Sequence, residues 1–508
     1  MDKYDVCVIG SGPGGFAAAM RAFDFGKRVC VVEGGHIGGA GIMHGALTSK
    51  TLWELSKDYA VAAAVDRGYR VSGLTVDYQA VRDTVLQAAK EKQYQILSQL
   101  ETFSPGRWKG RGALVLKRGY ARFADSRTVE VSLDGGAAER IQAEFFVIAT
   151  GSQPREFLGI PTDGECIITS DGILGFRAFP KRLLIIGAGT LGCEYASIFA
   201  NFGQTKVHLL DRQPRILPSE DADISAFDND NLEAKGVMVH HSSIPRAIHK
   251  HPEFLEVVVD YEDSRSQVLE VDAALVSVGR APNVAMLGLD RIGIKPNARG
   301  GLDTDVTCRV RDNIWAVGDV TQHSALANVA EMEGRYAAKA MYGRNQHPLR
   351  YHNMSTIMFF TPEVAAVGLN EQQCQEKKTA YRVAYYSNAL LNRAIAMRHT
   401  TGFVKILISE DGQNRILGMR AAGPQASSTI MVIAHLMDQD KGVEEIMKSI
   451  HPHPSITEGI QECLRLLVNK SVYKPLVFPD SMHIRSWRPA TGYADLVGKS
   501  AEATLFPT

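Results

Sequence analysis

Two glycine-rich segments have the residue types and the spacing that bind the phosphates of a dinucleotide. Each follows a short apolar run, residues 4–9 in the first case and 183–186 in the second, and each has the spacing G-x-G-x-x-G. The first glycine of this motif permits a tight turn, the second lets the backbone approach a pyrophosphate, and the third lets the next helix pack close to the strand. The N-terminal N–H groups of that helix then point at the phosphates. The motif glycines are Gly10, Gly12 and Gly15 in the first segment and Gly187, Gly189 and Gly192 in the second.

An acidic residue ends the next predicted strand in both segments. RVCVVE ends at Glu33, and KVHLLD ends at Asp211. A carboxylate at this position accepts hydrogen bonds from a ribose hydroxyl and repels the 2′-phosphate of NADP. Arg212 and Arg215 follow Asp211 and partly offset that repulsion. The sequence therefore predicts two dinucleotide-binding folds, and the second favours NAD(H) over NADP(H).

Two further segments contain apolar runs that we predict to be buried strands. EFFVIATGSQPR, residues 144–155, leads into a Thr-Gly-Ser turn, which is a natural exit from the first domain. NIWAVGDV, residues 313–320, ends in Gly318 and Asp319. Ligands of such sheets bind beyond the carboxyl ends of the strands, so Asp319 lies where a ligand would be.

The composition is that of an ordinary globular protein with several domains. The chain has 508 residues, of which 45% are hydrophobic and 22% are charged, and its formal net charge is zero. About 150 residues per domain gives three or so domains, and the zero net charge predicts no nucleic-acid partner. No apolar run approaches the roughly 20 residues that span a bilayer, so no membrane span is predicted. The N-terminus leads directly into a predicted strand rather than a signal peptide, and the seven cysteines form no CxxC pair or metal cluster. We therefore expect a cytoplasmic protein without a metal site.

Several motifs besides the two glycine segments follow one another in the order of a known family. Taken together, they resemble the class I pyridine nucleotide–disulfide oxidoreductases, in the dihydrolipoamide dehydrogenase-like branch. The resemblance covers roughly residues 4–468. The further motifs are LGIP at 158–161, ITSDGIL at 168–174, VSVGRAPN at 276–283, AVGDV at 316–320, LANVAEMEG at 326–334, FFTPEVAAVG at 359–368 and HPHPSITE at 451–458.

This resemblance implies an α/β protein with two Rossmann-like domains and a C-terminal α+β dimerisation domain. The FAD-binding domain would be discontinuous, at residues 1–150 and 283–350, with the NAD(P)-binding domain at 151–282 between its parts. The dimerisation domain would occupy residues 351–470 and make a homodimer. A C-terminal extension, residues 471–508, continues beyond the usual end of the family.

The resemblance also implies four catalytic residues. Lys50 and Glu194 would form an ion pair near flavin N5 and the nicotinamide, where a lysine stabilises negative charge on the reduced flavin. His453 would be an acid–base group supplied by the other subunit, and Glu458 would orient it and raise its basicity. Asp319 would bind the ribityl chain of the flavin, and the backbone around Ala121 would meet the adenine. The matching motifs add Thr150, Gly151 and Gly279 to the cofactor-binding residues.

The chain departs from the family in the segment that carries the redox-active disulfide. The family has the form GGTCLNVGCIPSK there, whereas residues 38–50 are GGAGIMHGALTSK, with Gly41 and Ala46 at the cysteine positions. Disulfide exchange needs a thiolate close to the flavin, so we expect no disulfide reduction by the usual route. His44 is a further polar group in this segment.

Three functions are compatible with this pattern. The working hypothesis is an FAD-dependent NAD(P)H dehydrogenase that passes hydride to a non-disulfide small-molecule acceptor, possibly a quinone. A soluble pyridine nucleotide transhydrogenase is the second. The third is a flavoprotein that has lost turnover and acts as a binding or scaffold subunit.

The C-terminal part of the chain is predicted to contain both strands and helices. Strands are expected within 359–368, 402–409 and 416–423, and amphipathic helices at about 426–440 and 457–468. The tail after about residue 470 is rich in aromatic residues and proline, so it is unlike a flexible linker. Covering the partner subunit and restricting the acceptor pocket are its two candidate roles, and the last dozen residues are expected to be disordered.

Overall fold

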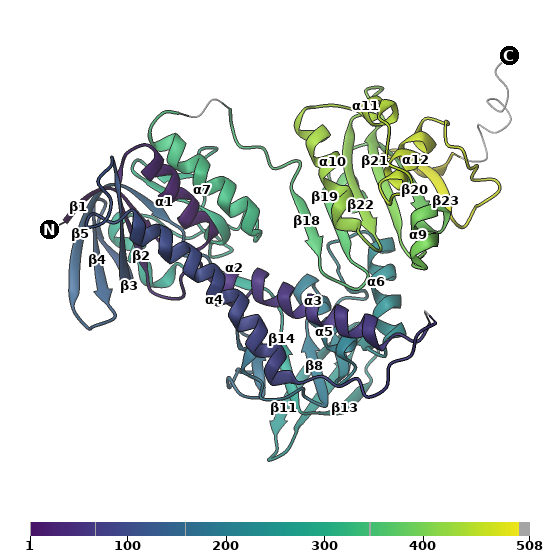
Figure 1. The fold of residues 1–508 in the computed structure, drawn as a ribbon, viewed down its shortest axis with the longest axis horizontal. Coiled ribbons are helices and arrows are strands. Elements are labelled where there is room, and N and C mark those ends of the chain that lie inside the picture. The colour runs from purple at the N-terminus through teal and green to yellow at the C-terminus, as the bar shows by residue number, and fades with distance from the viewer. Residues whose placement is uncertain (1, 67, 158, 345–346, 497–508) are drawn as a thin grey trace. The chain divides into compact units, whose positions relative to one another are not determined.

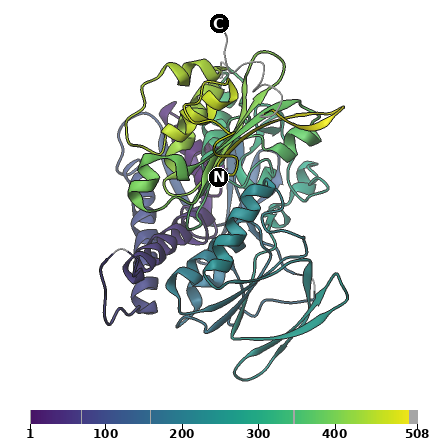
Figure 2. The same cartoon turned by 90° about the vertical axis from the view of Figure 1, so that its right-hand side faces the viewer.

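The computed structural model describes residues 2–66, 68–157, 159–344 and 347–496, and the expectation of disorder in the last dozen residues falls outside them. The chain, drawn as a ribbon in Figures 1 and 2, divides into two compact units by its internal contacts. The first contains Met1–Ile186, Ala247–Val258 and Val268–Leu349, and the second contains Gly187–Arg246, Val259–Gln267 and Arg350–Thr508. Among the described residues, no helix is long and apolar enough to span a membrane.

The first unit contains most of the parallel strands. Its helices are α1 (Pro13–Asp24), α2 (Ala40–Met43), α3 (Ala46–Ala63), α4 (Tyr78–Thr102) and α7 (Ala327–Met341). Its strands are β1 (Asp2–Ile9), β2 (Arg28–Glu33), β3 (Ala113–Asp125), β4 (Thr128–Leu133), β5 (Ala138–Ile148), β6 (Ser152–Pro154), β7 (Ile167–Thr169), β8 (Arg182–Ile186), β14 (Ala273–Val276), β15 (Arg280–Pro282), β16 (Arg309–Arg311) and β17 (Ile314–Ala316). Short 3-10 turns are η1 (Ser170–Gly175), η2 (Ala285–Leu287), η3 (Leu289–Ile292) and η4 (Gly318–Thr321).

The main sheet of the first unit forms the first predicted nucleotide fold. Strands β3, β2, β1, β5 and β17 pair in parallel in that order. Strand β4 pairs antiparallel with the second half of β3 and with the first half of β5. The last residues of β1 and β2 are almost completely buried, as expected for strands covered on both faces. Helices α1 and α7 pack against each other beside this sheet (Figure 1). A second parallel group, β8, β14 and β7, and the antiparallel pair β6 and β15 complete the unit.

The second unit contains the remaining elements. Its helices are α5 (Thr190–Phe202), α6 (Ala222–Ala234), α8 (Glu371–Glu376), α9 (Asn392–Met397), α10 (Ala426–Asp438), α11 (Val443–Lys448) and α12 (Glu458–Leu467), with a 3-10 turn η5 (Asn388–Leu390). Its strands are β9 (Lys206–Leu210), β10 (Met238–His240), β18 (Ser355–Met358), β19 (Val364–Gly368), β20 (Tyr381–Ser387), β21 (Phe403–Ser409), β22 (Ile416–Ala422), β23 (Met482–Arg488) and β24 (Gly492–Asp495). Strands β11 (Ser243–Lys250), β12 (Leu255–Tyr261) and β13 (Ser266–Val271) have residues in both units.

A seven-stranded antiparallel sheet dominates the second unit, in the order β18-β19-β22-β21-β20-β23-β24. Helices α10 and α12 pack on it and bury a continuous apolar core. The strands and the two helices predicted between residues 359 and 468 are therefore confirmed, with helix ends that differ by one or two residues. The extension is also structured up to Leu496, because β23 and β24 are the last two strands of this sheet.

Candidate functional site

In the first glycine loop, each glycine has the local geometry that its position in the motif predicts. Gly10 has φ +104°, and a Cβ there would lie 2.3 Å from the carbonyl oxygen of Ala149, so only glycine fits. A Cβ on Gly15 would lie 2.0 Å from the carbonyl oxygen of Gly10, which explains how α1 approaches β1 so closely. Gly12 precedes the first turn of α1 and, unlike Gly10 and Gly15, has free space where a Cβ would be. Apart from its chain neighbours, no atom of the described residues comes within 4 Å of the place where its Cβ would be. This open position at a helix N-terminus fits a pyrophosphate.

The carboxylate of Glu33 holds this loop against the end of β2. Its Oε2 accepts hydrogen bonds from both the backbone N–H and the hydroxyl of Ser11, each at 2.7 Å. Its Oε1 accepts the N–H of Gly35, also at 2.7 Å. The side chain is buried, so these bonds fix its orientation beside the glycine loop.

The second glycine loop repeats the geometry of the first. Gly187 also has φ +104°, and its N–H donates to the carbonyl oxygen of Leu210 at 2.7 Å. Gly189 precedes α5, and its Cβ position is open in the same sense as that of Gly12. Gly192 is buried within α5. The two loops are therefore two copies of one local structure.

Asp211 directly follows β9, and backbone N–H groups fix its carboxylate as they fix that of Glu33. Its Oδ2 accepts the N–H of Ala188 at 2.6 Å, and its Oδ1 accepts the N–H of Gln213 at 2.8 Å. Arg212 is exposed, whereas the guanidinium of Arg215 is held by three oxygens of the second unit. These are the carbonyls of Glu220 and Pro218 and the side chain of Gln372, at 2.6, 3.1 and 3.0 Å.

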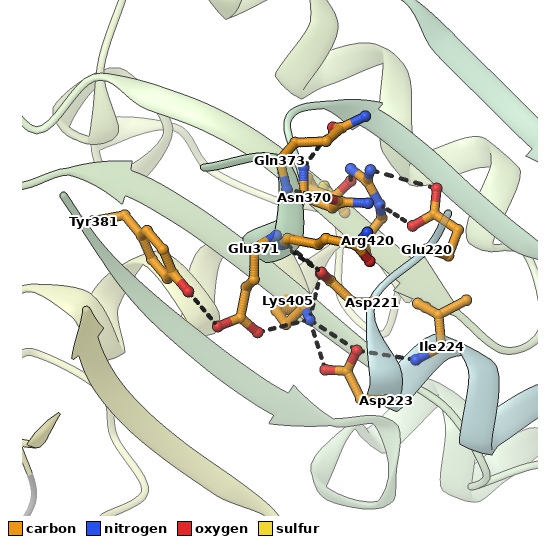
Figure 3. A network of polar contacts seen from close by, with 12 residues as sticks. Glu220, Asp221, Asp223, Ile224, Asn370, Glu371, Gln373, Tyr381, Lys405 and Arg420 are labelled. Atoms are coloured by element: carbon orange, nitrogen blue, oxygen red, sulfur yellow. Dashed lines mark hydrogen bonds and ion pairs between the residues drawn. The ribbon is translucent and has the colours of Figure 1, made fainter. Parts of the chain in front are cut away.

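A buried ionic cluster fixes the far end of the loop that begins at Asp211 (Figure 3). The ammonium group of Lys405, in β21, lies 2.6 Å from Asp221, 2.7 Å from Asp223 and 3.0 Å from Glu371. Lys405 is 1% exposed, and Asp221 and Asp223 stand at the start of α6. Burial alone would lower the pKa of Lys405, but the three carboxylates outweigh it and raise that pKa above its ordinary value. The spacing of residues in the sequence gives no sign of this cluster.

Three segments that are distant in the sequence meet around Asp319. Asp319 lies in η4, just beyond β17, and its Oδ2 accepts the hydroxyl of Ser152 at 2.6 Å. The same hydroxyl accepts the Nε–H of Arg280 at 2.8 Å, and the hydroxyl of Thr150 donates to the carbonyl of Asn283 at 2.7 Å. These hydrogen bonds bring two predicted segments close to Asp319, namely the turn at Thr150 and Gly151 and the motif that contains Gly279. Sequence reasoning missed Ser152 and Arg280, although both lie in quoted motifs.

Other predicted site residues have defined positions within their own units. Ala121 is buried in β3, opposite Val131 of β4. Lys50 is half-buried in α3 of the first unit and donates to the hydroxyl of Ser49 at 3.3 Å. Glu194 is buried in α5 of the second unit and accepts the N–H of Phe359 at 3.1 Å. The predicted ion pair between Lys50 and Glu194 stays a prediction.

His453 and Glu458 are brought together as predicted. The imidazole Nδ1 of His453 lies 2.8 Å from the Oε1 of Glu458, which is the first residue of α12. The Oε2 of Glu458 accepts the N–H of Ser455 at 2.8 Å. Burial would raise the pKa of Glu458, but the bonds from His453 and Ser455 outweigh it and lower that pKa. An ionised Glu458 makes Nδ1 the protonated nitrogen of the ring, and the side chain of His453 is 61% exposed.

The segment that contains Gly41 and Ala46 forms the short helix α2 and the start of α3. A Cβ on Gly41 would lie 3.3 Å from Pro13, which is a tight contact. His44 follows α2, and its ring lies 5.2 Å from that of His36. Burial lowers the pKa of His44, and the charge of Asp171 partly opposes this. No cysteine occurs in the sequence between Cys30 and Cys166.

Comparison with known proteins gives the class to which this fold and these loops belong. The family model of the pyridine nucleotide-disulphide oxidoreductases matches residues 4–334, and that of their dimerisation domain matches residues 354–464. The chain therefore belongs to the pyridine nucleotide–disulphide oxidoreductase family. Enzymes of this family depend on FAD and bind NAD(P).

Individual relatives agree with this assignment. The dihydrolipoyl dehydrogenase of Geobacillus stearothermophilus is 33% identical over 477 residues, which cover 93% of this chain and 97% of the relative. That of Bacillus subtilis is 32% identical over 475 residues, covering 93% and 98%. Among solved structures, LpdA of Mycobacterium tuberculosis has a TM-score of 0.82 at 25% identity, covering 92% of this chain and all of LpdA. The HOCl-induced flavoprotein disulfide reductase RclA of Escherichia coli, in its Cu(II) complex, has a TM-score of 0.80 at 26% identity, with the same coverage.

Proposed function

We propose that this protein is an FAD-dependent NADH dehydrogenase whose electron acceptor is a small molecule other than a disulfide, such as a quinone. The observation that carries this proposal is the pair Gly41 and Ala46, at the two positions where the family has its redox-active thiols. Bound FAD would accept a hydride from the reduced nicotinamide and give two electrons to the acceptor. Without thiols in this segment, the usual electron exit to a disulfide is absent.

The first glycine loop and the segments around Asp319 would hold the FAD. The open Cβ position of Gly12 accommodates a phosphate, and Glu33 and Asp319 supply carboxylate oxygens for ribose and ribityl hydroxyls. The remaining residues of this proposed site are Gly10, Gly15, Lys50, Ala121, Thr150, Gly151 and Gly279.

The second glycine loop, with Gly187, Gly189 and Gly192, would hold the nicotinamide nucleotide and prefer NADH. Asp211 stands where it would accept the 2′-hydroxyl of the adenosine ribose, and its charge disfavours a 2′-phosphate. Arg215, which would offset that charge, already donates to Glu220, Pro218 and Gln372. This engagement of Arg215 supports the preference for NADH.

His453 would supply a proton to the reduced acceptor. Reduction of a quinone to the hydroquinone by hydride transfer needs one further proton, which would come from the Nε2 of the His453 imidazolium and be replaced from solvent. Glu458 would stabilise the imidazolium form through its bond to Nδ1. Because His453 is exposed within its own chain, we propose that it acts at a site shared with a second subunit of a homodimer. Lys50 and Glu194 would lie near flavin N5 and the nicotinamide, where Lys50 would stabilise the negative charge of the reduced flavin.

Anaerobic stopped-flow spectroscopy of the purified flavoprotein tests this proposal. NADH should bleach the flavin absorbance, and a quinone such as menadione should restore it. Failure of NADH to bleach the bound flavin would contradict the dehydrogenase and would favour a scaffold protein without turnover. Robust reduction of lipoamide would contradict the non-disulfide acceptor. Rapid hydride exchange between NADPH and thio-NAD, without quinone reduction, would identify a transhydrogenase instead.

A further inference from the structure

The described part of the C-terminal extension, residues 471–496, is attached to the second unit in two places. At its start, the Oε2 of Glu462 in α12 accepts the hydroxyl of Ser471 at 2.9 Å and the N–H of Val472 at 3.2 Å. Further along, β23 pairs with β20 over six residues. The match to the family's dimerisation domain ends at residue 464, so both attachments join residues beyond the match to residues within it. Residues 471–496 are therefore a fixed part of this domain.

Aromatic and polar contacts strengthen the second attachment. The indole ring of Trp487 in β23 stacks on Tyr381, with 5.7 Å between ring centroids. The hydroxyl of Tyr493 in β24 donates to Glu371 at 3.1 Å. Glu371 and Tyr381 belong to the polar network in Figure 3, where Glu371 also binds Lys405. Strands β23 and β24 of the extension are therefore linked to the buried ionic cluster through Glu371.

Between these two attachments, a short apolar segment faces outward. Val472, Leu476 and Val477 are 72%, 75% and 66% exposed. A turn in which Lys474 accepts the N–H of Val477 at 2.9 Å and donates to Ser471 at 2.6 Å fixes their backbone. Single exposed apolar residues are common on protein surfaces, but here three lie in the short segment 472–477, whose backbone these bonds fix.

This apolar turn begins on the same face of α12 as the acid–base pair. Glu458 and Glu462 are four residues apart on the helix, so their side chains are neighbours. Glu458 binds His453, and Glu462 binds the start of the turn. Ile450, which precedes His453 in the same loop, is 99% exposed. Exposed apolar side chains therefore lie before and after the His453–Glu458 pair in the chain.

We infer that Val472, Leu476 and Val477 pack against a second copy of this chain and form part of the subunit interface beside His453. The dimerisation domain that matches residues 354–464 includes His453 and Glu458, and the apolar turn continues its surface from Glu462. In a homodimer with His453 at a shared site, burial of these side chains would bring apolar surface of the extension next to the acceptor of the other subunit. This inference rests on the proposed role of His453.

The test is the dimer dissociation constant, measured by sedimentation velocity on the purified flavin-containing protein. The double variant Leu476→Asp/Val477→Asp should raise this constant at least about ten-fold, because two charges would enter an apolar contact. The matched control is Met286→Asp, since Met286 is also an apolar residue of similar exposure, 79%, but lies in the first unit. The control should leave the constant unchanged. A milder variant, Val472→Ser, should raise it by a smaller factor.

Two further measurements test the subunit contact and the folding of the variants. A photoreactive amino acid at position 476 should cross-link to a second copy of the chain, and circular dichroism checks that the variants are folded. An unchanged dissociation constant in folded variants, or a monomeric wild type, would overturn the inference. So would binding of the wild type to anionic vesicles that Leu476→Asp/Val477→Asp abolishes without affecting dimerisation. None of these readouts requires turnover, so the inference can fail while NADH still bleaches the flavin.

Discussion

The Nδ1 of His453 and the Oε1 of Glu458 lie 2.8 Å apart, and the second oxygen of Glu458 is bonded to the N–H of Ser455. This arrangement fixes the imidazole ring in one orientation and assigns its proton to Nδ1 as long as Glu458 is ionised. The Nε2 nitrogen is then the one available to a substrate, apart from a long contact of 3.5 Å with the amide of Asn392. In the proposed function, the two residues would act as an oriented acid–base pair.

Replacing Glu458 by glutamine should slow the oxidative half of the reaction. The variant keeps the size of the side chain but removes the charge that stabilises the imidazolium, so proton delivery to the reduced acceptor should slow roughly ten- to hundred-fold. Flavin reduction by NADH should be unchanged. Stopped-flow measurement of both half-reactions checks this, with Glu444→Gln on the exposed surface of α11 as the control. Equal slowing of both half-reactions would contradict the assignment.

Alanine at Gly12 and at Gly15 should have different effects. Gly15→Ala places a methyl group 2.0 Å from the carbonyl oxygen of Gly10, which should destabilise the protein by about 2–3 kcal/mol. Gly12→Ala meets no such clash, but it occupies the open position at the start of α1 and should reduce FAD retention at nearly unchanged stability. The ratio of flavin to protein absorbance and the thermal midpoint separate the two cases. Full FAD retention in Gly12→Ala would show that the phosphate lies elsewhere.

Asp211→Asn should weaken discrimination between the two nicotinamide nucleotides. The amide can still accept the N–H of Ala188, but it no longer repels a 2′-phosphate, so the ratio of NADPH to NADH dissociation constants should fall at least about ten-fold. Fluorescence titration of the oxidised flavoprotein measures both constants. Glu253→Gln, at an exposed position, is the control. An unchanged ratio would assign specificity to other residues.

The sequence predicts those parts of the site that depend on local backbone geometry. Gly10, Gly15 and Gly187 are required by a positive φ or by a close backbone approach, and such requirements appear as fixed spacings of glycine. The pair His453 and Glu458 is similarly local, five residues apart around the start of a helix. For this reason the geometry of the two glycine loops and the contact between His453 and Glu458 were predictable, as was the alternation of strands and helices that leads to them.

Contacts between residues far apart in the chain were not predictable in this way. Ser152 and Asp319 are separated by 167 residues, and Lys405 and Asp223 by 182. Periodicity and turn motifs describe the conformation of single segments, whereas these contacts depend on how the segments pack. The pairing of β23 with β20 has the same origin, since the composition of the tail predicts order but not the strand it joins.

Lys405→Met should strongly destabilise the second unit. The change leaves three carboxylates close together in a buried site, and removing one partner of a buried ion pair costs about 3–5 kcal/mol. Lys448→Met is the matched control, because its ion pair with Glu444 is exposed and contributes about 0–1 kcal/mol. Denaturant unfolding of both variants measures the difference. Similar losses of unfolding free energy in the two variants would mean that burial does not strengthen the ion pairs of Lys405.

His208 should make the protein less stable in mild acid. Burial, with the neighbouring His240, lowers the pKa of His208 from 6.5 to about 4. Above pH 6.5 the ring is neutral in both the folded and the unfolded chain, so it carries no penalty. Between pH 6.5 and 4 the unfolded chain binds a proton that the folded chain does not, so stability falls as the pH falls. The urea midpoint should drop between pH 7.5 and pH 5 by more in the wild type than in His208→Gln. Equal drops would exclude His208 as a cause.

The pairing of β23 with β20 also affects what the protein does when it is cut. Without β23, the seven residues of β20 would become the rim of the sheet, with one row of backbone N–H and C=O groups unpaired. Such a rim is a template for the strands of other molecules, and β20 is largely buried and rich in tyrosine. Loss of β23 after proteolysis near residue 480 would therefore expose β20 and make the protein prone to aggregation. By pairing with β20, β23 prevents that exposure.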